Sequence, residues 1–334
     1  MSKQGYFVIS LDFELYWGMF DKVSLPVYGE NIKSVHTVIP ELLALFEAND
    51  IHATWATVGM LMHKNKTALL AALPEKSLQP EYSNPELSSY HHIENSYIGA
   101  DEFEDPHHFG ASLINQILET KGQELASHTF SHYYCIDGSK NSGAIFAADC
   151  KAMRTVVTDY TTSPSSIIFP RNQTNNTALK ICKENGITAY RGTEKHFLYN
   201  ARKESAQTNL FIRGLRLLDH YINISGNHTY PLTKTKETLL TNIPASRFLR
   251  PYSQSLRFLE TLRLRRIKRA MTHAAKYGEI FHLWWHPHNF GSNRKENMQN
   301  LMELLNHYKT LKEEYDMGSK NMRDIEELTK TLSE

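Results

Sequence analysis

The sequence is poor in cysteine and has no long run of apolar residues. Its three cysteines, Cys135, Cys150 and Cys182, lack CxxC spacing, which argues against a disulfide framework and indicates a reducing compartment. No stretch approaches the ~18 uninterrupted apolar residues that a transmembrane helix needs. The first residues, MSKQGYFVISLDFE, lack the apolar core and the small-residue cleavage site of a signal peptide. We therefore expect a cytoplasmic protein without an integral membrane segment.

An excess of charge of either sign is also missing. The 334 residues include 37 Lys and Arg against 36 Asp and Glu, a formal net charge of +1. This balance argues against a nucleic-acid binder with a large phosphate footprint and gives no sign of a polybasic membrane anchor. The hydrophobic share of 41% is that of a globular protein. The 17 histidines are numerous, so a functional histidine has to be identified by its position.

Strand-like and helix-like segments alternate along most of the chain. Strands are predicted over residues 6–13, 51–59, 123–128, 165–170, 187–192 and 279–288. Helices are predicted over residues 36–48, 109–120, 143–160, 177–186, 253–278 and 295–316. This alternation implies parallel strands joined by right-handed crossovers. Because no low-complexity linker interrupts the pattern, we expect an α/β fold with one barrel-like domain over residues 1–334.

Other stretches fit this alternation less well. Residues 63–107 are polar and rich in loops, and we expect ordered loop with short helices over a functional face. Residues 195–252 are irregular and are interpreted as a possible insertion. The Arg/Lys run within 253–278 is interpreted as a solvated helix face. The charged tail after residue 317 is expected to be peripheral.

Polar residues stand at the carboxyl ends of the predicted strands, where barrels of this kind hold their function. Asp12 and Glu14 end the first strand, and period-two alternation places both carboxylates on the same side. The third strand ends in HTFSH, in which His128 and His132 can face one point. An isolated pair with this spacing is as often two loop histidines bonded to backbone. The neighbouring acids favour a catalytic metal site, since two histidines and one carboxylate leave positions for water and substrate.

Two further strand ends have cationic or titratable groups. Arg171, in FPRNQ, is expected to hold one carboxylate ionised, and its alternative is a surface ion pair. His286 and His288 follow the last strand in LWWHPHNFG, where a satisfied core histidine is the ordinary interpretation. Taken together, the strand ends indicate a metal-assisted hydrolase or another enzyme with a 2-His-1-carboxylate site.

These motifs resemble those of the polysaccharide deacetylase family, the NodB-homology carbohydrate esterases. SLDFE is similar to the Asp-x-Glu variant branch of the first motif, HTFSH matches H-[ST]-x-x-[HD], and LWWH resembles the leucine-rich strand that ends in histidine. ATWATVG resembles the family's ATFFVxG strand. FPRNQ matches R-x-P loosely. The fourth motif, an acid beside tryptophan, has Asp219 as its candidate.

The resemblance implies a distorted (β/α) barrel with about seven strands and a divalent metal ion, for which Zn²⁺ is expected. The metal ligands would be Glu14, in place of the usual aspartate, His128 and His132. Asp12 would be the general base, Arg171 would orient it, and His286 would protonate the leaving amine.

The implied activity is removal of an N-acetyl or related acyl group from an amino sugar or surface-glycan precursor in polysaccharide biosynthesis. An N-acylated amino sugar is therefore the expected partner, and no nucleic acid is expected. A non-haem iron enzyme with the same 2-His-1-carboxylate set is one alternative. The other is an inactive homologue that binds carbohydrate without turnover.

Overall fold

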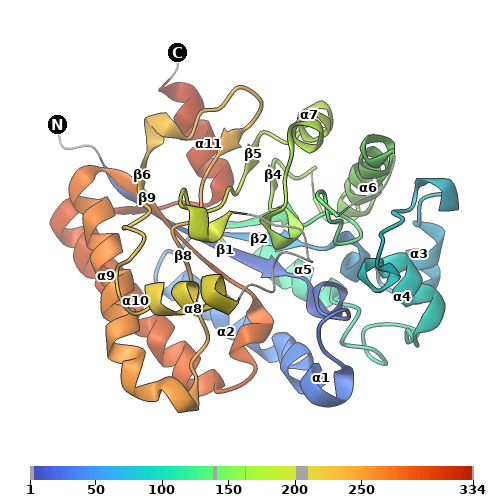
Figure 1. Ribbon diagram of the computed structural model, residues 1–334, viewed down its shortest axis with the longest axis horizontal. Coiled ribbons are helices and arrows are strands. Elements are labelled where there is room, and N and C mark those ends of the chain that lie inside the picture. Colours follow the sequence, from blue (N-terminus) through green and yellow to red (C-terminus); the bar gives the residue numbers. More distant parts are fainter. Residues whose placement is uncertain (1–3, 138–140, 162, 201–209, 333–334) are drawn as a thin grey trace.

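A computed structural model describes residues 4–137, 141–161, 163–200 and 210–332. Its centre is a curled sheet in the order β6-β9-β1-β2-β3-β4-β5-β7, with β10 paired to β1 and β8 paired to β9 (Figure 1). The strands are β1 (Tyr6–Phe13), β2 (Ala53–Thr57), β3 (Gln123–Ser127), β4 (Ser166–Ile167), β5 (Ala189–Tyr190), β6 (Tyr230–Pro231), β7 (Thr241–Asn242), β8 (Arg247–Phe248), β9 (Glu279–Trp285) and β10 (Gly318–Ser319). Only β6 pairs antiparallel among these strands. The predicted α/β fold of barrel type is confirmed.

The sequence of β1 explains its central place in the sheet. All eight residues of YFVISLDF are buried, as expected for a parallel strand covered on both faces. Phe13 pairs with Thr57 of β2, and Thr57 pairs with Ser127 of β3. On the other side of β1, Leu11 pairs with Trp285 of β9. Because these strands are parallel and in register, the residues that follow them meet at one edge of the sheet.

Helices surround this sheet (Figure 1). They are α1 (Leu25–Lys33), α2 (Val35–Ala48), α3 (Lys66–Ala71), α4 (Ser89–Asn95), α5 (Ala111–Glu119), α6 (Ser142–Val157), α7 (Asn176–Glu184), α8 (Leu210–Asp219), α9 (Glu260–Tyr277), α10 (Arg294–Tyr315) and α11 (Met322–Thr331). In α2, Val38, Leu42 and Phe46 are fully buried at a spacing of four, so one stripe of the helix faces the core. None of the described helices is long and apolar enough to cross a membrane.

The tail after residue 317 is not peripheral, contrary to the sequence-based expectation. Strand β10 pairs with β1, and Met322 and Ile325 of α11 are fully buried. A capping box formed by Asn321 and Asp324 begins the helix. The high charge of this segment concealed a short apolar stripe that completes the core.

The irregular stretches contain short elements of their own. Residues 63–107 contain α3 and α4 with short 3-10 turns, as expected. Within 195–252, residues 201–209 lie outside the described part. The remainder contributes β7 beside β5 and β8 beside β9. That this stretch is an insertion in a single domain stays a prediction.

Candidate metal centre and active site

Glu14, directly after β1, lies between two pairs of imidazoles. Its Oε2 lies 3.1 Å from Nε2 of His132 and 3.5 Å from Nε2 of His128. Its Oε1 lies 3.3 Å from Nε2 of His288 and 3.6 Å from Nε2 of His286. Two groups in this cluster have the geometry to hold a metal ion, Glu14 with His128 and His132, and Glu14 with His286 and His288.

The turn that presents HTFSH is held from outside by α6. Thr129 and His132 have φ values of 64° and 55°, a left-handed conformation that is unfavourable for residues with a Cβ. The Asp149 carboxylate accepts from the backbone N–H groups of Phe130, at 2.7 Å, and Ser131, at 3.0 Å. It also accepts from the Ser131 hydroxyl at 2.5 Å. Burial raises the pKa of Asp149 to about 6. Asp149 is therefore a positioning residue that sequence reasoning missed.

Hydrogen bonds at the far side of the imidazoles fix which nitrogen faces Glu14. His128 Nδ1 lies 2.8 Å from the Ile168 carbonyl oxygen, which can only accept, so Nδ1 holds the proton and Nε2 offers a lone pair. His286 Nδ1 likewise lies 3.3 Å from an acceptor, Asn289 Oδ1, so its Nε2 also offers a lone pair. Burial lowers the pKa of His286, which favours its neutral form. Lone pairs and a carboxylate that face one another repel, and a cation between them removes that repulsion.

The electrostatics of Glu14 agree with this interpretation. Burial alone would raise its pKa, but the surrounding imidazoles, first of all His286, lower that pKa well below its usual value. Its side chain is 4% exposed, as is that of His288, while His128 is 1% exposed. The donor set is thus an ionised carboxylate among buried imidazoles, which fits a divalent metal ion of the zinc type.

His288 is a member of this cluster to which the sequence assigned no role. Its Nδ1 lies 3.0 Å from the hydroxyl of Tyr28 in α1, while its Nε2 faces Glu14. A residue that holds the far nitrogen of an imidazole fixes the orientation of the ring. Tyr28, His288 and Glu14 therefore form a chain of contacts from α1 to the centre of the site. Nothing in the local sequence around Tyr28 indicates this contact.

Asp12 is bound by an arginine other than the predicted one. Arg191 Nη1 donates to Asp12 Oδ1 at 2.7 Å, and Nη2 donates to Oδ2 at 2.8 Å. Arg191 is 1% exposed and Asp12 is 4% exposed. Burial would raise the pKa of Asp12, but the Arg191 guanidinium together with the nearby His128 and His286 outweighs it, and the net shift is downward. Arg191 follows β5 at the end of the predicted strand ITAYRG, so its place at a strand end was a usable signal.

The expectation that Arg171 orients Asp12 is therefore corrected. Arg171 has a left-handed φ of 53°, and its Nη2 donates to the Asp21 carboxylate. Its guanidinium also lies over the Tyr134 ring, 4.1 Å from the centroid. The turn after Pro170 thus directs this side chain toward Asp21, while Arg191 occupies the position beside Asp12.

Arg191 is itself held by a wider polar network. It donates to Ser10 Oγ at 3.0 Å and to Asn172 Oδ1 at 3.1 Å, and it lies 4.2 Å from the centroid of the Trp284 ring. His282 Nε2 lies 2.8 Å from the same Ser10 hydroxyl. Beside this network, Asn172 lines a cleft of about 460 Å³. The network joins the buried ion pair to an open cleft at the carboxyl ends of the strands.

His286 lies at the more open side of the cluster. Its side chain is 23% exposed, and its Nε2 lies 3.8 Å from Asp12 Oδ2. Asp219, the candidate for the missing motif, does not contact it. Asp219 accepts from Arg247 at 2.6 Å and from Tyr199 at 2.6 Å instead. The partner of the His286 ring is Asn289, three residues further along the chain.

Comparison with known proteins gives one family and one fold. Residues 16–190, just over half of the chain, match the family model described as polysaccharide deacetylase. That range contains HTFSH but begins after Glu14 and ends before His286. No curated protein is detectably similar in sequence.

Solved structures resemble the whole chain at low sequence identity. A Mycobacterium smegmatis protein assigned to the polysaccharide deacetylases has a TM-score of 0.57 at 11% identity, over 99% of this chain and 92% of that chain. Puue allantoinase has a TM-score of 0.51 at 11% identity, over 96% of this chain and 88% of that chain. A 4-alpha-glucanotransferase from Thermococcus litoralis reaches 0.50 at 11% identity, over 94% of this chain and 37% of that chain. At this identity the likeness establishes the fold.

Proposed function

Because the chain belongs to the polysaccharide deacetylase family, we propose that it is a metal-dependent hydrolase that removes an N-acetyl or related acyl group from an amino sugar or surface-glycan precursor. The observation on which this depends is the meeting of Glu14, His128 and His132 at one buried point, with Asp12 beside them. The three cysteines are free thiols, which supports a reducing compartment such as the cytoplasm.

Glu14, His128 and His132 would hold the ion, and Zn²⁺ suits two imidazoles and a carboxylate. When bound, such an ion supplies a Lewis acid that polarises an acyl carbonyl. Glutamate is one methylene longer than the aspartate usual in the family. The contact of its Oε1 with His288, at 3.3 Å, restrains this longer side chain and leaves Oε2 toward His128 and His132.

Asp12 and His286 supply the base and the acid. The bidentate contact with Arg191 keeps Asp12 ionised and fixes its orientation, so that it can accept a proton from the attacking water. His286 Nε2, 3.8 Å from Asp12 Oδ2, would first take up the proton that Asp12 accepts from the water and then pass it to the leaving nitrogen, because an amine leaves poorly unless it is protonated. Arg191 takes the orienting role that the sequence assigned to Arg171.

The cleft beside Arg191 is suited to a polar ligand. Its volume is about 460 Å³, and its polar lining includes Asn172, Thr174, Glu194 and Asn242. Amide, hydroxyl and carboxylate groups pair with sugar hydroxyls and N-acyl groups. An amino sugar placed there would bring its acyl group toward Asp12 through the side of the site on which Arg191 lies.

The experiment measures acetate release from N-acetylated nucleotide sugars and small oligosaccharides by metal-loaded protein. Asp12→Asn should abolish release while metal content stays near that of the wild type, because Asp12 is a base and not a ligand. Asp50→Asn, at an exposed pair with Lys312, is the matched control and should release acetate normally. Metal loss in Asp12→Asn would instead make Asp12 a ligand.

Two further measurements on the same protein, consumption of a 2-oxo acid and binding of an N-acetyl sugar, distinguish the two alternatives. A non-haem iron enzyme would consume a 2-oxo acid and would leave the Asp12–Arg191 pair without a role. An inactive homologue would bind an N-acetyl sugar and release no acetate over hours. Either result would overturn the hydrolase proposal.

A further inference from the structure

A groove of about 510 Å³ runs beside α9, away from the metal cluster. It lies between this helix and residues 221–227. Its cationic residues come from α9 and are Arg265, Arg266, Arg269, His273 and Lys276. None of the described residues that line the groove has a carboxylate. Apolar and aromatic side chains, Ile222 and Tyr277 among them, complete the walls.

Arg266 distinguishes this groove from an ordinary solvated helix face. It is 4% exposed, and its Nη2 donates to the Gly226 carbonyl oxygen at 2.5 Å. Its Nε and Nη1 have no hydrogen-bond partner among the described residues. Buried donors without partners are costly. Burial, and then the neighbouring Arg247, lower the pKa of Arg266 to about 10, as expected for a guanidinium without sufficient negative charge nearby.

The carboxylates close to the groove already interact with other side chains of the protein. Asp219 lies 3.8 Å from Arg266 but only 2.6 Å from Arg247. Glu279 lies 3.4 Å from His273 and accepts from Thr229 as well. Neither carboxylate therefore balances the charge of Arg265, Arg269 and Lys276. The interpretation of this face as merely solvated fits the exposed Arg265 and Arg269 but not the buried Arg266.

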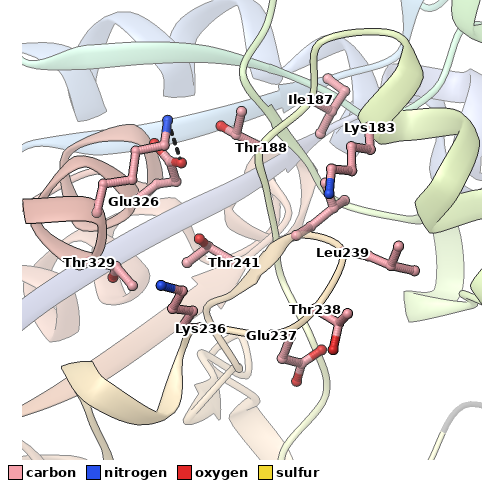
Figure 2. A pocket seen from close by; sticks show the side chains of 12 residues that line it. Lys183, Ile187, Thr188, Lys236, Glu237, Thr238, Leu239, Thr241, Glu326 and Thr329 are labelled. Carbon is pink, nitrogen blue, oxygen red and sulfur yellow. Dashed lines mark ion pairs between the residues drawn. The ribbon is translucent and has the colours of Figure 1, made fainter. Parts of the chain in front are cut away.

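A second cavity of similar size provides the comparison. It has a volume of about 500 Å³ and lies where the chain enters β5 and β7 (Figure 2). Lys183, Lys236 and Lys330 line it together with Glu237 and Glu326, and Glu326 is paired with Lys330 at 2.7 Å. Two carboxylates within the cavity thus offset most of its positive charge. Among the described residues, the lining of the α9 groove has no carboxylate to do the same.

We propose that the α9 groove binds a phosphate-bearing ligand, with Arg266 as its buried anchor and Arg265 and Arg269 at its rim. A guanidinium presents several N–H donors in a planar fork that matches phosphate oxygens. Ile222 and Tyr277 would contact the apolar or ring portion next to the phosphate. The phosphate can belong to a free compound or to an anionic lipid headgroup, since both offer the same chemistry. This site is independent of the proposed hydrolase activity.

The test measures binding of inorganic phosphate to the full chain by calorimetry, and sedimentation of the chain with phosphatidylglycerol vesicles against phosphatidylcholine vesicles. The double variant Arg265→Gln and Arg269→Gln should weaken binding by about tenfold or more, because charge-assisted hydrogen bonds are lost. Arg154→Gln, at an exposed position on α6, is the matched control and should bind as the wild type does.

Each outcome decides the proposal. Saturable phosphate binding that the double variant loses supports a free ligand, and selective binding of phosphatidylglycerol vesicles supports a lipid headgroup. Absence of binding to both probes overturns the proposal, as does equal weakening by Arg154→Gln. Because neither probe is an acylated sugar, failure here leaves the hydrolase proposal to its own test.

Discussion

Replacement of Arg191 by methionine tests the buried ion pair at the centre of the site. Arg191 and Asp12 are 1% and 4% exposed, and two hydrogen bonds of 2.7 and 2.8 Å join them. Methionine keeps much of the volume but leaves the carboxylate buried and unpaired. Breaking a buried pair in this way costs about 3–5 kcal/mol, a large part of the ~5–15 kcal/mol that stabilises a typical domain. Equilibrium urea unfolding measures this loss.

Activity measurements and a double variant show what the Asp12–Arg191 ion pair itself contributes. Arg191→Met should lower kcat/KM by about a hundredfold or more, because the base loses its fixed orientation. Asp12→Asn combined with Arg191→Met should be more stable than Arg191→Met alone, since no buried charge remains unpaired. Arg171→Met is the matched control and should keep most of the activity, because Arg171 contacts Asp21 instead.

Two results would refute this reasoning. One is an unfolding free energy of Arg191→Met within about 1 kcal/mol of the wild type, the value typical of a surface ion pair. The other is a reversal of the two arginines, with Arg171→Met inactive and Arg191→Met active. That reversal would show that the family motif, and not the observed contact, identifies the orienting residue.

The remaining predictions concern residues around the site. Tyr28→Phe removes the hydroxyl 3.0 Å from His288 Nδ1. Because His288 restrains the proposed ligand Glu14, metal affinity in a chelator competition should fall, by up to about tenfold, while Tyr252→Phe should not change it. Asp149→Asn replaces one carboxylate oxygen, which accepts a hydrogen bond, by an amide nitrogen, which cannot accept one. This should lower the unfolding free energy by about 1–3 kcal/mol, and unchanged thermal stability would contradict it. Burial lowers the pKa of His282 to about 3 from 6.5, so its stabilising contribution is complete above pH 6.5 and is lost as the pH falls toward 3. Between pH 7 and 4 the wild type should lose about 3 kcal/mol more than His282→Gln, and parallel pH curves in urea unfolding would show that His282 titrates normally.

The long buried strands could be predicted from the sequence with good bounds. The run YFVISLDF predicts a strand at residues 6–13, the bounds observed for β1, because a continuous apolar run is typical of a strand covered on both faces. The strands predicted at 165–170 and 187–192 are only two residues each in β4 and β5. Local composition does not show where hydrogen bonding to a neighbour stops. Strand β10 and helix α11 were missed because their pairing partner lies at the other end of the chain.

In the candidate site, too, some residues could be predicted from the local sequence and others could not. Glu14, His128 and His132 could be selected because each follows a predicted strand, and the register of the sheet brings them together. Arg191 also follows a strand, but the loose likeness of FPRNQ to a family motif favoured Arg171. The contacts of Tyr28 and Asp149 depend on segments that meet only in the folded chain. Sequence spacing therefore indicates the proposed ligands more readily than the residues that hold them in place.

The central claim is that Glu14, His128 and His132 together hold one divalent ion. Elemental analysis of the wild type and of Glu14→Gln, His128→Gln and Asp12→Asn, loaded with Zn²⁺ and desalted in parallel, tests it most directly. The account predicts about one ion per chain in the wild type and Asp12→Asn, and a fall of roughly tenfold or more in the other two variants. Full zinc content in Glu14→Gln, or a folded wild type that retains no zinc, would contradict it.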